Sequence, residues 1–280
     1  MACIKQKKPT VSVCIPTYLG GATLGASIAS VLAQSHTDFE LIVLDDNSPD
    51  DTRDVVAQFH DSRLVYRRNE INLGPQGNWN QCLSVAQGTY FKLLPHDDLL
   101  HPDCLARQIG ILESDRNNHL ALVFSTRNIL RPDGRFLMHR GYPGGREGVI
   151  TSDSIMRACV RRGTNLIGEP GGVLFRKALA DKVGFFDATN PYVIDLDYWF
   201  RLLAHGEAFY CAEPLVGFRI SGRSWSVAIG MGQDIDFRHF LARIAKRDAL
   251  PATTFDYVIG RLTPTLNNLA RLLIYRIYLR

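Results

Sequence analysis

Residues 11–45 read VSVCIPTYLGGATLGASIASVLAQSHTDFELIVLD. The apolar runs at the two ends of this stretch, 11–15 and 39–44, are rich in β-branched residues, as strands buried on both faces are. Between them, apolar residues recur at helical spacing, at Leu24, Ile28, Val31 and Leu32. A strand, a helix and a second strand in this order predict a parallel βαβ unit and hence an α/β fold.

The composition is that of an ordinary folded protein. Of the 280 residues, 46% are hydrophobic and 21% are charged, which excludes disordered and collagen-like chains. The net charge of +4 is too small to indicate nucleic-acid binding, and the basic excess lies in residues 238–280, where eight Lys or Arg accompany two acids. The six scattered cysteines indicate a reducing compartment, and neither a signal peptide nor a membrane span is visible, so we expect a cytoplasmic protein.

The polar loops that follow the predicted strands are the expected place for a ligand. Further strands are predicted at 64–66 and 90–94, with a helical stripe over about 79–88 between them. Three polar loops follow strands: Pro16 to Tyr18, Asp45 to Ser48, and Pro95 to Asp98. In a parallel sheet these loops meet at the carboxyl edge, where ligands of open α/β folds bind.

Other parts of the pattern predict individual elements. Ser48 and Pro49 suit the start of a helix that runs to about Phe59. Residues 171–175 predict a strand, and a helix is expected from about Asp195 to His205. The pattern loosens after residue 125, and the chain after residue 230 is expected to be mainly helical.

Two acidic pairs in the loops admit more than one interpretation. Asp45 and Asp46 are either a polar turn or acceptors for the donors of a bound base and ribose. Asp97 and Asp98, which follow His96, are either solvated acids before a helix or ligands of a hard divalent cation under a diphosphate. A His-Asp pair also occurs in metal-dependent phosphohydrolases, but their all-helical scaffold conflicts with the predicted strands.

The order of the motifs resembles that of the family 2 glycosyltransferases with the GT-A fold. The similarity begins with VSVCIPTYLGG, continues with LIVLDDNSPDDT and NLGPQGNWNQCLSVAQGTYFKLLPHDDLLHP, and extends through EPGGVLFRKALADKVGFFD to DLDYWFRL, covering about residues 10–226. It implies a Rossmann-like, mostly parallel central sheet flanked by helices. We expect a GT-A domain over 1–230, with a nucleotide-sugar half at about 1–125 and an acceptor half at about 126–230, and a helical C-terminal extension over 231–280.

The resemblance also implies roles for individual residues. Asp46 would accept a hydrogen bond from the base, Asp97 would hold Mn²⁺ or Mg²⁺ against the diphosphate, and Asp195 would be the catalytic base. Nucleotide contacts are expected from Pro16, Thr17, Tyr18, Asp46, Asn72, Gly74, Asn78 and His96. Supporting or acceptor contacts are expected from Asp98, Glu169, Trp199 and Arg219. Trp199, four residues after Asp195 on one helix face, would help shape the acceptor pocket.

These roles imply an inverting transfer of a sugar from a nucleoside diphosphate to a hydroxyl of a glycan or lipid-linked glycan, with UDP or dTDP favoured and no nucleic-acid partner. The departing diphosphate needs its charge neutralised, which a metal does, and the acceptor hydroxyl needs a base, which a carboxylate provides. A glycosidase would instead place two carboxylates across a glycosidic bond. The resemblance therefore predicts an enzyme of surface-polysaccharide biosynthesis.

Three positions depart from the family pattern. Pro95 stands where the first Asp of a D-x-D metal motif is usual, Ile194 replaces a Glu before the catalytic Asp, and Ser221 replaces a His that often binds metal. His96 then occupies the middle position of the motif. These departures leave open a nucleotide-sugar-binding protein whose catalysis is weakened or lost.

The C-terminal segment LARLLIYRIYLR, Leu269 to Arg280, mixes aliphatic, aromatic and Arg residues as helices at a membrane interface do. Such a helix would suit an enzyme that is peripheral on the inner face of a membrane. The alternative is a helix that packs on the domain or at a dimer contact, and the sequence leaves both interpretations open.

Overall fold

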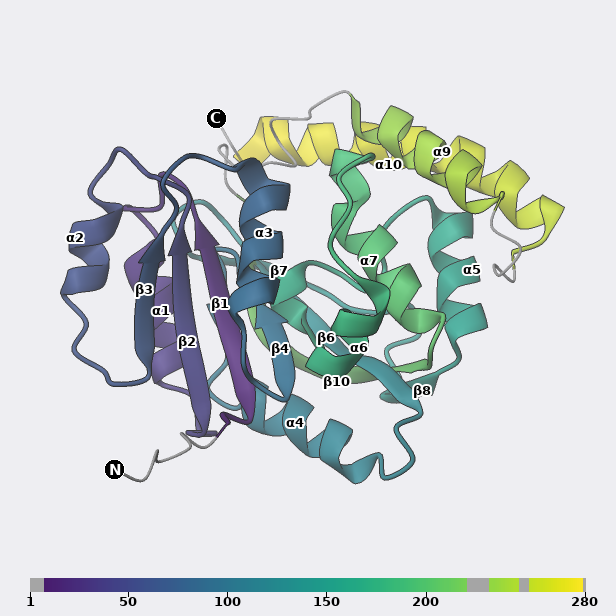
Figure 1. Ribbon diagram of the computed structural model, residues 1–280. Coiled ribbons are helices and arrows are strands. Elements are labelled where there is room, and N and C mark those ends of the chain that lie inside the picture. The colour runs from purple at the N-terminus through teal and green to yellow at the C-terminus, as the bar shows by residue number, and fades with distance from the viewer. Residues whose placement is uncertain (1–7, 221–231, 247–251, 279–280) are drawn as a thin grey trace.

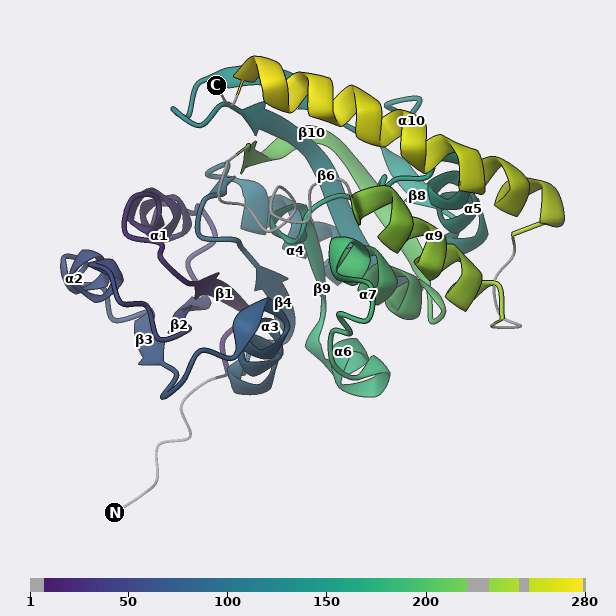
Figure 2. The same cartoon turned by 90° about the horizontal axis from the view of Figure 1, so that it is seen from above.

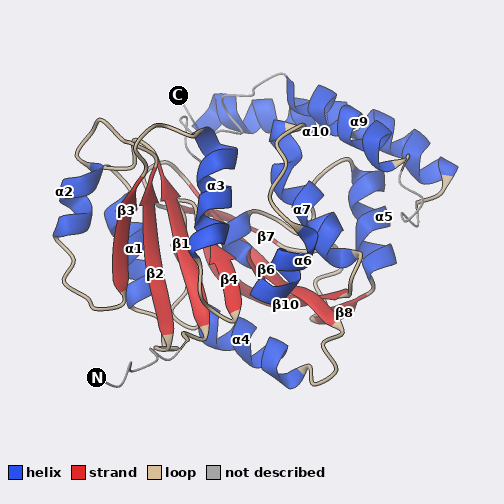
Figure 3. Ribbon diagram, in the orientation of Figure 1, coloured by secondary structure: helices blue, strands red, loops and turns tan. Residues whose placement is uncertain are grey.

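The computed structural model describes residues 8–220, 232–246 and 252–278, with side chains of the last helix described as far as Leu269. The chain folds as a mixed α/β structure (Figures 1 and 3). The strands are β1 (Val11–Thr17), β2 (Phe39–Asp45), β3 (Leu64–Arg68), β4 (Tyr90–Leu93), β5 (Leu99–Leu100), β6 (Leu120–Leu130), β7 (Phe136–Arg140), β8 (Gly148–Ile150), β9 (Val173–Arg176) and β10 (Glu207–Arg219). The helices are α1 (Leu24–Leu32), α2 (Thr52–Ala57), α3 (Gly74–Val85), α4 (Cys104–Ser114), α5 (Ser152–Arg162), α6 (Lys177–Val183), α7 (Ile194–Leu203), α9 (Gln233–Ile244) and α10 (Thr254–Tyr278), with short 3₁₀ turns η1 (Pro170–Gly172) and η2 (Pro191–Val193).

The described strands form one sheet in the order β3-β2-β1-β4-β9-β6-β10-β5, with β7 beside β6 and β8 beside β10. The first four strands of this order are parallel, as the βαβ pattern predicts. Further along, β9 runs antiparallel between β4 and β6, whereas β6 and β10 are parallel. The predicted parallel sheet is therefore found in the first half of the chain, and the second half is mixed.

Helices cover both faces of the sheet, as the view from above shows (Figure 2). Each face has its own apolar core. Cys14 and Leu44 belong to the core that includes residues of α3, α5, α6, α7 and α9. Val13 and Val43, their neighbours along the strands, belong to the core under α1 and α4. Both faces are buried, which explains why the strand segments are continuous apolar runs rather than alternating ones.

The predicted start of the helix after β2 is wrong. α2 begins at Thr52 rather than near Ser48, because the polar residues before it bind the turn after β1. Ser48 Oγ accepts a hydrogen bond from Leu19 N, and Thr52 Oγ1 accepts one from Gly20 N, each at 3.1 Å. These side chains tie the loops after β1 and β2 together instead of capping a helix.

Two other boundaries shift slightly. The strand predicted at 171–175 begins at Val173, because its two glycines belong to the turn η1. The helix expected from Asp195 begins at Ile194 and ends at Leu203.

The last two helices lie at the end of the molecule toward which β1, β2 and β3 point, on the side of α5 and α7 (Figures 1 and 2). Phe237 and Phe240 of α9 are buried in the same core as Trp199 of α7. α10 packs against α5 and α9. The helical character expected after residue 230 is confirmed, while a domain boundary there stays a prediction. None of the helices in the described part of the chain has the length and apolar composition that a bilayer crossing requires.

Candidate active site

The loops after β1, β2 and β4 meet at the carboxyl edge of the sheet, as the sequence predicts. Asp46 N donates a hydrogen bond to Thr17 O at 2.8 Å, which joins the first two loops. Ser27 Oγ of α1 lies 2.8 Å from His96 O and 2.7 Å from Asp98 O, which holds the third loop against this helix. The polar side chains of this edge therefore sit on short loops that are bonded to one another.

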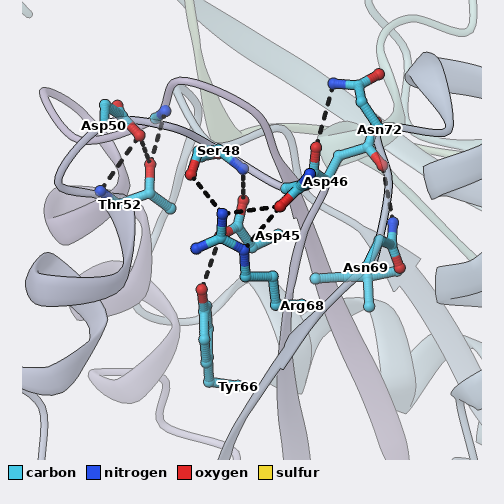
Figure 4. A network of polar contacts seen from close by, with 12 residues as sticks. Asp45, Asp46, Ser48, Asp50, Thr52, Tyr66, Arg68, Asn69 and Asn72 are labelled. Atoms are coloured by element: carbon cyan, nitrogen blue, oxygen red, sulfur yellow. Dashed lines mark hydrogen bonds and ion pairs between the residues drawn. The ribbon is translucent and has the colours of Figure 1, made fainter.

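Asp45 and Asp46 are both buried but have different partners (Figure 4). Asp45 accepts hydrogen bonds from Ser48 N at 2.9 Å and from the Tyr66 hydroxyl at 2.7 Å. Asp46 Oδ1 accepts hydrogen bonds from Asn69 Nδ2 and from Leu73 N, both at 2.8 Å. Asp45 thus shapes the turn, whereas Asp46 is oriented by the loop after β3.

Thr17 and Tyr18 end β1 with different exposure. The Thr17 hydroxyl is buried and makes no hydrogen bond within the described residues. An unpaired buried hydroxyl costs free energy, so this group is suited to a ligand. A Cβ at Gly20 would lie 2.1 Å from Thr17 Oγ1 and 3.4 Å from the His96 ring, so the glycine allows these loops to approach. Tyr18 is exposed, and Pro16 is buried within the strand.

Of the predicted nucleotide-binding residues after β3, one is exposed at the edge of the site and another is buried beneath it. Asn72 is exposed and donates through Nδ2 to Asp46 O at 3.1 Å. Gly74 has φ +72° with open space where a side chain would stand. Asn78 is buried in α3 and donates to Leu44 O at 3.0 Å. Any effect of Asn78 on a nucleotide would therefore pass through the β2 loop.

The two acids after His96 differ in exposure. Asp97 is half-buried, whereas Asp98 is fully buried. Asp98 Oδ1 accepts a hydrogen bond from Arg219 N at 3.1 Å, and Arg219 Nε donates to Asp97 O at 3.1 Å. Burial, and next the charge of Asp97, raise the pKa of Asp98 well above its usual range. Asp97 is thus the acid of this loop that reaches solvent.

A buried ion pair lies in the second half of the site. Arg127 of β6 is buried, and its Nε lies 2.5 Å from Glu169 Oε2. Burial lowers the pKa of Arg127, and the charge of Glu169 opposes this effect. Gly168 has φ +107°, and a Cβ there would lie 2.6 Å from Arg127 Nη1. Only glycine suits both the backbone conformation and the space beside the guanidinium.

Asp195 lies in the first turn of α7 and is half-buried. Its Oδ2 accepts a hydrogen bond from Asn165 Nδ2 at 2.9 Å, and its Oδ1 accepts one from Leu196 N at 2.7 Å. Asn165 Nδ2 and Trp199 Nε1 both donate to Gly168 O, at 3.0 and 3.1 Å. Because Trp199 is fully buried, its predicted effect on an acceptor pocket would act through Gly168.

The pKa of Asp195 is suited to proton transfer near neutral pH. Burial raises this pKa to about 7, the charge of Glu169 adds to the rise, and hydrogen bonds from Leu196 N and Asn165 oppose it. Glu169 also raises the pKa of Asp98. Glu169 therefore couples the acidic loop after β4 to Asp195, and a carboxyl group with this pKa can act as a general base.

Three residues of the site are missing from the sequence prediction. Arg127 and Lys92 are cations inside apolar strands, and a charge in a buried strand signals a specific partner. Lys92 Nζ donates to Gly171 O at 2.8 Å and to Val173 O at 3.2 Å, beneath η1. Asn165 carries no comparable signal, because nothing in its polar loop sets it apart.

Few side chains are available to hold a metal. Nowhere in residues 8–220, 232–246 and 252–278 do three His, Cys, Asp or Glu side chains cluster as a metal site requires. Ser221, at the position of the usual His, lies outside these ranges. Asp97 offers one accessible carboxylate, and Mg²⁺ is commonly held by one or two carboxylates plus substrate phosphates. The residues present fit a cation that binds together with a diphosphate.

A sequence model of the family described as glycosyl transferase family 2 matches residues 12–184, more than half of the chain. The chain belongs to this family. The family 2 protein is 35% identical over 223 residues to UDP-Glc:alpha-D-GlcNAc-diphosphoundecaprenol beta-1,3-glucosyltransferase WfgD of Escherichia coli. The matched region covers 77% of this chain and 79% of WfgD. It is therefore a glycosyltransferase, as the motif order predicts.

Two solved structures share the fold of this family 2 glycosyltransferase. TarS 1–349 of S. aureus in complex with UDP-GlcNAc has a TM-score of 0.66 at 18% identity, covering 92% of this chain and 72% of that one. Mannosyltransferase PcManGT of Pyrobaculum calidifontis, in complex with GDP-Man and Mn²⁺, has a TM-score of 0.62 at 16% identity, covering 96% and 76%. At these identities the likeness shows the fold, and it confirms the predicted GT-A architecture.

Proposed function

We propose that this enzyme transfers a hexose or deoxyhexose from a UDP-sugar to a hydroxyl of a lipid-linked glycan, with inversion at the anomeric carbon. The observation that carries the proposal is Asp195, a carboxyl group with a pKa raised to about 7, whose neighbour Glu169 also acts on Asp98 in the loop of Asp97. WfgD is named for a UDP-Glc donor and a diphosphoundecaprenol-linked acceptor, and TarS binds UDP-GlcNAc. Both names support UDP over dTDP.

The nucleotide is assigned to the loops after β1 and β2. Asp46 accepts the imino hydrogen of the base, for which a fixed carboxylate is a good partner. The unpaired Thr17 hydroxyl supplies a further hydrogen bond. Tyr18 and Asn72 contact the nucleotide from the exposed rim, and His96 does so from the loop that Gly20 approaches. Donor binding then uses about residues 1–125, and the acceptor binds residues of 126–230.

Asp97 is the residue that would hold Mn²⁺ or Mg²⁺. It is the accessible carboxylate of its loop, and Arg219 fixes the loop through Asp97 O. When bound, the cation neutralises charge on the departing diphosphate. PcManGT, with the same fold, has been solved with Mn²⁺ and GDP-Man, which supports the use of a divalent cation.

Asp195 acts as the general base. It takes the proton of the acceptor hydroxyl while that oxygen forms a bond to the anomeric carbon and the bond to the diphosphate breaks. One displacement of this kind inverts the anomeric centre. Asn165 and Leu196 N orient the carboxylate, and burial together with the charge of Glu169 raises its pKa to about 7, where proton abstraction is effective.

A cytoplasmic location is part of the proposal. The cysteines of the described residues are unpaired, which suits a reducing compartment. They are all buried: Cys14, Cys82, Cys104, Cys159 and Cys211.

The test compares Asp195→Asn and Asp97→Asn with Asp153→Asn, an exposed acid on α5 that serves as the matched control. Transfer from UDP-sugars should fall by about 100-fold or more in both site variants and stay unchanged in the control. By calorimetry, Asp195→Asn should bind UDP as the wild type does, whereas Asp97→Asn should lose the part of UDP affinity that depends on Mn²⁺. A wild type that binds UDP but transfers to no lipid-linked acceptor would instead support the alternative of a binding protein without catalysis.

A further inference from the structure

The outward face of α10 is apolar. Its large side chains there are each between 55% and 68% exposed, which for a helix packed on a domain is unusual. They are Phe255, Val258, Leu262, Leu266 and Leu269, spaced three, four, four and three residues apart, and we call them the α10 stripe. This spacing puts all five on one side of the helix.

The inward face of the same helix is small and polar. Its buried residues are four apart: Asp256, Gly260, Pro264 and Asn268. A surface helix normally buries its apolar residues and exposes its polar ones. Although Tyr257 packs partly buried against the core, the large aliphatic side chains of α10 point outward, which suits an apolar partner on the outside.

Specific contacts with α5 prevent α10 from rotating its stripe into the protein. Asp256 forms ion pairs with Arg157, at 3.0 Å, and with Arg161. A Cβ at Gly260 would lie 2.5 Å from Val160 O, so the two helices touch through their backbones. Rotation would break the ion pairs and place a large side chain where only glycine fits.

The charge around the stripe favours a negatively charged partner. Arg261 lies beside the stripe on α10 and is exposed, as is Arg162 at the end of the neighbouring α5. In the sequence, residues 238–280 carry eight Lys or Arg and two acids, of which Arg238 and Arg243 on α9 form ion pairs. A second copy docked through this face would bring like charges together, whereas an anionic bilayer attracts them and accepts the apolar side chains.

We propose that the α10 stripe docks the enzyme on the surface of an anionic lipid bilayer. The helix lies along the edge of the molecule toward which β1, β2 and β3 point, the edge that carries the active site (Figures 1 and 2). Docking through this face would bring the active site to lipid-linked acceptors, and to that extent the inference rests on the proposed function. The stripe ends at Leu269, where the segment 269–280 that the sequence singles out begins, and the side chains of 270–280 lie outside the described residues.

The test is flotation with vesicles of phosphatidylcholine, with and without phosphatidylglycerol. The wild type should float with the anionic vesicles and much less with the neutral ones, and salt should weaken binding. Leu262→Gln/Leu266→Gln should lower the partition coefficient by about tenfold or more, because two exposed leucines no longer enter the lipid. Val149→Gln/Phe185→Gln, which changes two comparably exposed apolar residues away from α10, should float as the wild type does.

Equal flotation of the two double variants, or no flotation of the wild type, would overturn the proposal. So would a wild-type dimer by light scattering that Leu262→Gln/Leu266→Gln converts to monomer, since that result identifies a second copy as the partner. Transfer to a short-chain, water-soluble acceptor separates this inference from the proposed function. If the wild type transfers but does not float, the enzyme assignment stands and the membrane surface does not.

Discussion

Glu169 forms an ion pair with Arg127, 2.5 Å from Oε2 to Nε, and at the same time its charge raises the pKa of Asp195. Arg127 comes from β6, Glu169 from the loop before η1, and Asp195 from α7. The negative charge of Glu169 and the positive charge of Arg127 act on Asp195 in opposite directions. Burial raises the pKa of the proposed base most, and the charge of Glu169 adds to that rise.

Activity should rise with pH through about 7. Asp195 works as a base when it is ionised. Burial and the charge of Glu169 raise its pKa, and below that pKa it is protonated. The acid limb of kcat/KM should thus lie near pH 7 rather than near 4, with a slope of one proton. Initial-rate assays over a pH series at a fixed, saturating Mn²⁺ concentration measure kcat/KM. An acid limb near pH 4 would contradict the role of Asp195 as the base.

Removing the charge of Glu169 and removing the charge of Arg127 should shift the acid limb of kcat/KM in opposite directions. Glu169→Gln removes a negative charge, so the pKa of Asp195 falls and the limb shifts to lower pH. Arg127→Met removes a positive charge, so the limb shifts to higher pH. The readout is the pH profile of kcat/KM, with circular dichroism to confirm folding. Shifts in the same direction would refute the electrostatic account.

Ionisation of Asp195 should lower the free energy of unfolding. Its pKa is about 7 in the folded state against the ordinary 3.8 of an aspartic acid. The folded state therefore binds more protons between these values, and the free energy of unfolding falls as pH rises from about 4 to 7. Asp195→Asn should remove this dependence and stabilise the protein at pH 8 by about 1–3 kcal/mol. Urea denaturation of the wild type and the variant at about pH 4.5 and about pH 8 measures the free energy of unfolding and tests this sign. An Asp195→Asn variant that is destabilised to the same extent at about pH 4.5 and about pH 8 would contradict this prediction.

Asp46→Asn should weaken UDP binding by about tenfold or more. Asp46 Oδ1 accepts hydrogen bonds from Asn69 Nδ2 and Leu73 N, and an amide at this position loses its charge and offers a donor in place of one acceptor. Asp54→Asn, an exposed acid of α2, is the matched control. Calorimetry with UDP measures both, and equal affinities would remove Asp46 from the nucleotide site.

Two helical glycines should respond oppositely to alanine. At Gly260 a Cβ would lie 2.5 Å from Val160 O, so Gly260→Ala forces α10 away from α5 and should lower stability by about 1–3 kcal/mol. At Gly110 of α4 nothing lies within 4 Å, so Gly110→Ala should raise stability by about 0.5–1 kcal/mol through its helix propensity. Thermal denaturation measures both. A stabilising Gly260→Ala would show that α10 does not dock closely on α5.

The sequence by itself determined the central features of the fold. Continuous apolar runs such as 39–44 specify strands buried on both faces, and the helical stripe between two of them specifies a parallel pair. The polar loops after these strands then have to meet at one edge. Asp46 and Asp97 lie on these loops, whereas the resemblance in motif order points to Asp195 on α7; the roles of all three stay predictions.

Only the tertiary structure decided which charges meet and how deeply each is buried. Arg127, Asn165 and Glu169 come together with Asp195 across three elements. The rise in the pKa of Asp195 comes from burial and from Glu169, whereas its chain neighbour Leu196 opposes that rise. The direction in which α10 faces was decided in the same way, since contacts with α5 hold its apolar side outward. Local periodicity specifies an element and its faces, but burial and electrostatic coupling depend on residues that are distant in the sequence.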